Sequence, residues 1–133
     1  MPQSPKEMTT AILAGALLPP SMFEQLDCNA ILDARDADAA YERDWLLAHD
    51  EQKARWMATG ANLTETADVD ALRRGAFLAV YAVTKHPELA GEISDDFELI
   101  AWAALLRAEN PFVECLWGSY SVGAVPIPNP RSH

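Results

Sequence analysis

Cysteine and histidine are scarce in this chain of 133 residues, which has two cysteines and three histidines. Two thiols cannot build the disulfide framework of a small secreted protein, so we expect Cys28 and Cys115 to be reduced and buried, as free cysteines usually are. The spacings His-Glu-x-x-His and Cys-x-x-Cys, which commonly hold zinc, do not occur in the sequence. The sequence therefore predicts no metal and no cofactor.

Basic residues and long apolar runs are scarce as well. No stretch reaches the roughly 18 to 20 apolar residues that span a bilayer, and the apolar segment from Met8 to Leu18 is too short for a secretory signal. The 10 lysines and arginines face 20 acidic residues, which gives a formal charge of -10. That charge repels nucleic-acid phosphates and anionic lipids. We therefore expect a cytoplasmic protein that binds neither nucleic acid nor membranes.

Hydrophobic residues make up 50% of the chain, and they follow helical spacing with no useful strand alternation. Two stretches, 76–83 and 97–106, are apolar on nearly every side and should lie at the centre of a helical bundle. The sequence predicts an all-α, single-domain bundle of about five to seven helices over 1–120. An extended, proline-rich tail should follow over 121–133, and its valines and isoleucine should lie along the bundle or along a partner.

Start and stop signals for helices set the expected boundaries. Ser4 and Glu7 form a capping box, and Asp95 and Glu98 form another that explains both carboxylates. Residues 62–66 should form a loop and 88–93 a link, with His86 at the end of a helix. The expected helices are 5–18, 21–28, one from Asp33 or Asp36 to 59 that bends or breaks near His49, one from Thr64 or Thr66 to 86, 95–110 and 111–117.

Acidic residues are unevenly distributed along the chain. The segment from Glu24 to Glu51 holds nine carboxylates against two arginines, whereas 52–87 has a net positive charge. A calcium loop near Asp36 is disfavoured because the glycine that such a loop needs is missing. Two interpretations remain, a solvated helix face and a surface that binds a basic partner. The acidic candidates for partner binding are Asp33, Asp36, Asp38 and Glu42.

Two aromatic residues near the tail are further candidates. Trp117 and Tyr120 stand where the last helix meets the tail, and aromatic residues are frequent at interfaces. Burial in the core is the alternative for both side chains. Asp95 and Asp96 could form an acid/base pair, but the capping box accounts better for this acidic group.

Three functions remain, of which we favour the first. The first is a non-catalytic acidic binding module that docks on a basic protein partner, as inhibitors, antitoxins and immunity proteins do, because complementary charge speeds encounter. The second is a structural or assembly component that forms homo-oligomers through its C-terminal region. The third is a metal-dependent hydrolase built from scattered acids and histidines, and it is disfavoured because nucleophile, base and orienting group cannot all be assigned. We therefore expect that the protein is not an enzyme.

Overall fold

The computed structural model describes residues 3–60 and 62–128, which fold into helices joined by short connections. This part of the chain contains six α-helices, one 3₁₀ helix and no strand. The elements are α1 (Pro5–Leu13), η1 (Pro20–Met22), α2 (Cys28–Ala37), α3 (Ala39–Ala58), α4 (Leu63–Thr84), α5 (Pro87–Leu106) and α6 (Pro111–Ser121). The all-α bundle of five to seven helices predicted from the sequence is confirmed.

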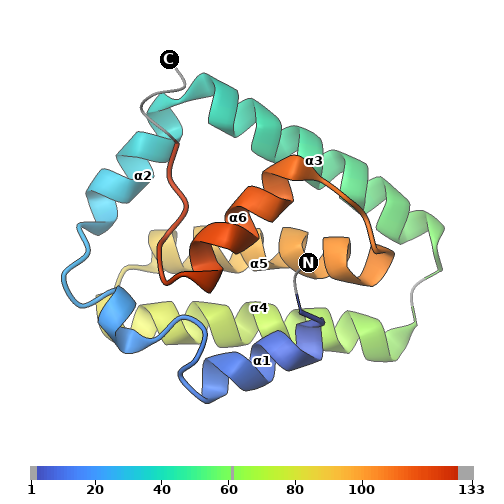
Figure 1. The fold of residues 1–133 in the computed structure, drawn as a ribbon, viewed down its shortest axis with the longest axis horizontal. Helices are drawn as coiled ribbons and strands as arrows, with labels where there is room; N and C mark the ends of the chain where they lie inside the picture. Colours follow the sequence, from blue (N-terminus) through green and yellow to red (C-terminus); the bar gives the residue numbers. More distant parts are fainter. Residues whose placement is uncertain (1–2, 61, 129–133) are drawn as a thin grey trace.

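Helix α5 lies at the centre of the bundle. It crosses the middle of the molecule behind α6, with α1 and α4 along one side and α2 and α3 arching over the other (Figure 1). Phe97, Leu99 and Ile100 have no exposed surface, and Trp102 is buried. The central position predicted for 97–106 is therefore confirmed.

Helix α4 is less enclosed than its composition predicted. It packs against α5 and α1, and Ala76 and Val80 are fully buried. Leu78 and Tyr81, however, are 52% and 39% exposed. The expectation that 76–83 is covered on all sides is wrong, because α1 and α5 cover only part of the circumference of α4.

The start of α5 also differs from the sequence prediction. His86 is the N-cap of α5, since its Nδ1 accepts a hydrogen bond from the Leu89 amide at 3.2 Å, and α5 begins at Pro87. Helix α4 ends just before it, with Lys85 in the left-handed conformation. The predicted link over 88–93 and the capping box at Asp95 are therefore wrong, and Asp95 lies inside a continuous helix.

Side-chain caps account for two further differences. Asp27 accepts a hydrogen bond from the Ala30 amide at 3.0 Å, so α2 is a separate helix that the sequence prediction missed. Asn62 accepts from the Glu65 amide at 2.7 Å and begins α4, so the predicted loop at 62–66 is wrong.

The remaining boundaries shift by a few residues. Helix α1 ends at Leu13 rather than Leu18, a short 3₁₀ turn replaces the predicted helix at 21–28, and α3 continues unbroken through His49. Helix α6 passes through Gly118 and ends at Ser121. Gly60 has the left-handed backbone expected of a residue that ends a helix.

The described part of the tail, 122–128, lies along its own bundle. Val125 and Pro126 are buried, and the Pro126 carbonyl accepts a hydrogen bond from Arg35 Nε at 3.0 Å. Residues 129–133 of the predicted tail lie outside the described residues.

The thiols differ in burial. Cys28 is half-buried and Cys115 is exposed, so the expectation of two buried thiols is wrong for Cys115. None of the described helices is long and apolar enough to cross a membrane.

Candidate functional site

A buried carboxylate, Asp96, lies at the point where four helices meet. Its side chain in α5 has no exposed surface and accepts three hydrogen bonds. Arg35 Nη2 from α2 and the Tyr120 hydroxyl from α6 donate to Oδ2 at 2.5 and 2.6 Å. Trp45 Nε1 from α3 donates to Oδ1 at 2.9 Å. Asp96 therefore ties α2, α3 and α6 to the central helix.

Arg35 supplies the positive charge that balances Asp96. Its side chain is 4% exposed, and its Cζ lies 5.3 Å from the centre of the Tyr41 ring. Burial disfavours the charged guanidinium, but the neighbouring Asp96 carboxylate outweighs that cost and the pKa of Arg35 is raised. The pair is therefore charged in the folded protein, and Arg35 also holds the C-terminal segment through Pro126.

Tyr120 is the second donor to the Asp96 Oδ2 atom. Burial, together with the negative charge of Asp96, raises the pKa of Tyr120 well above its usual value. The hydroxyl consequently keeps its proton at neutral pH and donates it to the carboxylate.

An open cleft of about 200 Å³ lies beside this network, where α2, α3 and α5 approach one another. Five carboxylates and one guanidinium line it, together with two aromatic side chains and one leucine. The guanidinium is that of Arg35, which Asp96 already balances. We call this feature the acidic cleft, and its lining residues are Arg35, Asp36, Tyr41, Glu42, Trp45, Leu46, Glu92, Asp95 and Asp96.

Two polar groups of the acidic cleft are poorly paired. The Glu92 side chain is 38% exposed, and its Oε1 atom lies 4.0 Å from Arg35 Nη1. Burial raises the pKa of Glu92, nearby carboxylates such as Asp36 raise it further, and Arg35 only partly offsets them. The Tyr41 hydroxyl is buried and makes no hydrogen bond to any described residue.

A second group of charges lies further along α5. Arg73 in α4 binds Asp95 Oδ1 at 2.6 Å through Nη2 and Glu98 Oε2 at 2.9 Å through Nη1. His49 Nε2 in α3 lies 3.9 Å from Glu98 Oε1. These ion pairs, rather than a helix cap, account for the acids at 95 and 98. They also leave Asp95 partly neutralised where it lines the acidic cleft.

The predicted acidic candidates fall into two groups. Asp36 and Glu42 both line the acidic cleft, although they belong to different helices. Asp33 is exposed on α2. Asp38 is 8% exposed and begins α3, accepting a hydrogen bond from the Tyr41 amide at 2.9 Å. The structure thus brings together only two of the four acids.

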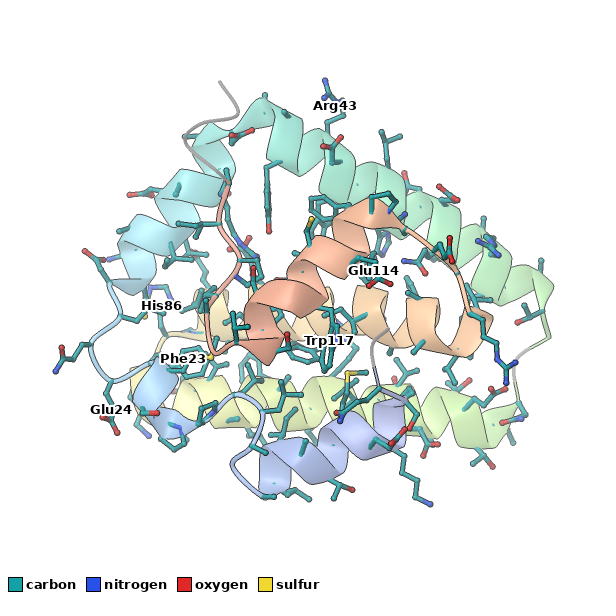
Figure 2. All side chains as sticks on the ribbon, in the orientation of Figure 1. Phe23, Glu24, Arg43, His86, Glu114 and Trp117 are labelled. Carbon is teal, nitrogen blue, oxygen red and sulfur yellow. The ribbon has the colours of Figure 1, made fainter. Side chains whose placement is uncertain are left out.

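The two predicted aromatic candidates lie on α6 and differ in burial. Tyr120 is 2% exposed and belongs to the Asp96 network. Trp117 is half-buried and packs against the core, and Figure 2 shows it on the side of α6 that is nearer to α4. Because Tyr120 is enclosed, it offers almost no surface to a partner. A partner contact by either residue stays a prediction.

Sequence reasoning considered Asp96 only as part of an acid/base pair, and it missed the roles of Arg35, Trp45 and Glu92. The available signal was the pair His86-Pro87, because proline is frequent in the first turn of a helix. A helix that begins there carries Glu92 and Asp96 four residues apart, on one face. That spacing would have indicated a carboxylate-bearing face in the middle of the central helix.

The histidines and acids considered for a metal site do not form a cluster in the described part of the chain. Within 3–60 and 62–128, no three histidine, cysteine, aspartate or glutamate side chains are placed to hold a metal ion. His49 and His86, the two histidines considered for such a site, instead contact Glu98 and Asn29.

The fold and the acidic cleft together define a small helical protein with a concentrated negative surface. A family model described as Immunity protein PIM1 matches residues 7–127, a range that includes all six helices almost completely. The chain therefore belongs to this family of immunity proteins. No curated protein matches the chain. Family membership supports a role of the immunity-protein type, which was one form of the binding hypothesis.

Proposed function

We propose that this protein protects a cell by binding a toxin, and that the toxin presents a basic surface to the acidic cleft and to the exposed acids beside it. Membership of the immunity-protein family carries the first part of the proposal, since the match spans residues 7–127. An immunity protein acts by occupying its target, so the proposed role needs no catalytic group. The encounter is proposed to take place in the cytoplasm.

The distribution of charge carries the second part. Asp36 and Glu42 line the acidic cleft, and Asp33 and Asp44 add exposed carboxylates on the same two helices. Arg43, a cation among these acids, points outward from α3 (Figure 2), and its Nε lies 3.7 Å from Asp44 Oδ1, so it partly offsets the charge of Asp44. A basic toxin would be attracted to this surface at long range, which raises association rates most at low salt.

The cognate toxin is identified by screening for a toxin whose effect on cells this protein neutralises, and its binding to the protein, measured by surface plasmon resonance, tests the proposal. The variant Asp36→Lys/Glu42→Lys reverses two carboxylates of the acidic cleft. The matched control, Asp70→Lys/Glu109→Lys, changes the net charge equally at two exposed acids outside the cleft. We expect the cleft variant to lower affinity by at least about tenfold, mainly through the association rate, and the control to lower it much less.

The ionic strength gives an independent reading. The Debye length falls from about 30 Å at 0.01 M salt to about 3 Å at 1 M, so the association rate should fall steeply over that range. An equal loss in the two double variants, or a rate that does not change with salt, would show that the toxin is not recognised through this acidic surface. Failure of the intact protein to bind or neutralise the toxin would reject the proposed function itself.

A further inference from the structure

We propose that the acidic cleft receives the guanidinium group of a single arginine side chain presented by the partner. This inference deepens the proposed function and rests on it for the identity of the partner. It assigns one anchoring contact within a larger docking surface.

The size of the acidic cleft favours one side chain over a free ligand. Pockets for drug-sized molecules usually enclose about 300 to 1,000 Å³, whereas this cleft has a volume of about 200 Å³. The acidic cleft is also open to solvent rather than enclosed. A partner side chain can therefore enter it while the partner backbone stays on the surface.

The charge of the acidic cleft favours a cation. Asp96 is already satisfied by Arg35, Tyr120 and Trp45. Asp95 is satisfied in part by Arg73. The remaining lining carboxylates are Asp36, Glu42 and Glu92.

An added cation would stabilise the ionised form of Glu92. The distance from Glu92 Oε1 to Arg35 Nη1 is 4.0 Å, which is too long for a hydrogen bond. The three carboxylates Asp36, Asp95 and Asp96 act on Glu92 unfavourably. An entering guanidinium would donate hydrogen bonds to Glu92 and relieve this repulsion.

The aromatic lining favours arginine over lysine. A planar guanidinium stacks on aromatic rings and presents several N–H donors in one plane, whereas an ammonium is a compact, strongly hydrated charge. The protein already uses this arrangement internally, since Arg35 lies over the Tyr41 ring while it binds a carboxylate. The buried Tyr41 hydroxyl has no hydrogen-bond partner among the described residues.

The test uses three blocked amino acids in place of the toxin: N-acetyl-arginine methylamide, the lysine analogue, and the citrulline analogue, which has the shape of arginine without its charge. Each is titrated into the intact protein, and NMR follows the Trp45 Nε1–H and the Leu46 methyl groups. We expect weak, saturable shifts at both residues with arginine, shifts several-fold weaker with lysine, and none with citrulline.

Paired variants locate the binding site. Leu46 lines the acidic cleft and Leu47, its exposed neighbour, does not. Glu92 lines it and Glu88, one turn earlier on α5, does not. We expect Leu46→Ala and Glu92→Gln to weaken arginine binding at least about threefold, and Leu47→Ala and Glu88→Gln to leave it unchanged. Circular dichroism melts of all four variants establish that each is folded.

Several results would overturn the inference. These are no saturable binding of the arginine probe, equal binding of citrulline or lysine, or equal effects of the cleft variants and their controls. The probes do not depend on the toxin. If arginine fills the cleft but the toxin does not bind, the proposed function fails and the arginine site stands. If the toxin binds through the acids but arginine does not fill the cleft, only this inference fails.

Discussion

Replacing Asp96 by asparagine should destabilise the protein strongly. The side chain keeps its shape, but its single carbonyl oxygen cannot accept from Arg35 and Tyr120 on one side and from Trp45 on the other. Either orientation of the amide sets its NH₂ group against at least one donor. Arg35, which is 4% exposed, also loses the charge that balances it.

The expected magnitude follows from the burial of this pair. Removing one partner of a buried ion pair costs about 3 to 5 kcal/mol, which is a large share of the about 5 to 15 kcal/mol that stabilises a typical domain. At about 4 °C per kcal/mol for a chain of this length, Asp96→Asn should lower the melting temperature by roughly 12 to 20 °C. Thermal and urea denaturation, each followed by circular dichroism, measure this loss.

A double-mutant cycle with Arg35→Met separates the ion pair from the other contacts. Each single change leaves one buried charge unbalanced, whereas the double change leaves none. The double variant should therefore be more stable than the sum of the single losses predicts, by about 2 to 3 kcal/mol. Losses that add to within about 0.5 kcal/mol, or an Asp96→Asn cost below about 1 kcal/mol, would refute this account of the network.

Three smaller changes test the acidic cleft. The pKa of Glu92 is raised from 4.5 in the folded protein, so ionisation of Glu92 lowers the free energy of unfolding as the pH rises. Glu92→Gln should therefore be more stable than wild type at pH 7, and the two proteins should be equally stable below pH 4.5. Urea titrations at the two pH values measure this difference. Toxin affinity, measured calorimetrically, should fall as pH drops through the raised pKa of Glu92, and less so in Glu92→Gln. Tyr41→Phe removes a buried, unpaired hydroxyl and should leave the melting temperature unchanged or higher.

The sequence predicted the architecture well where the signal was periodic. The stretch 97–106 is apolar on nearly every side, and only the centre of a bundle can bury such a helix. The same reasoning placed 76–83 too deep, because composition does not show how many neighbours a helix has. Alanines such as Ala79 and Ala82 also fit a partly exposed face, so the all-apolar pattern overstated the burial of α4.

A helix boundary was predicted wrongly where the sequence contains two possible N-caps for the same helix. Asp95 and Glu98 have the spacing of a capping box, but His86 and Pro87 begin the same helix eight residues earlier. An extended helix satisfies more backbone groups than a shorter one preceded by a link. The acids at 95 and 98 then became available for Arg73, a contact between helices that local spacing cannot show.

The acidic cleft could be predicted only in part. The excess of acid between Glu24 and Glu51 indicated the correct surface, and Asp36 and Glu42 do line the cleft. The other half comes from α5, more than 40 residues later in the sequence. A contact over that separation depends on how α3 packs against α5. Without an alignment, a single sequence offers no signal for that packing.

The Asp96 network and the acidic cleft have opposite effects on stability, although Arg35, Trp45 and Asp96 belong to both. Asp96 and Arg35 balance each other, so the buried charges hold four helices together and leave no net charge facing the cleft. Glu92, by contrast, is balanced only in part by Arg35 at 4.0 Å, and burial together with Asp36, Asp95 and Asp96 raises its pKa, so the ionised form of Glu92 lowers the stability of the free protein. A cationic partner would offset the repulsion between Glu92 and the neighbouring carboxylates. Part of the binding free energy would therefore come from removing an unfavourable interaction of the free protein.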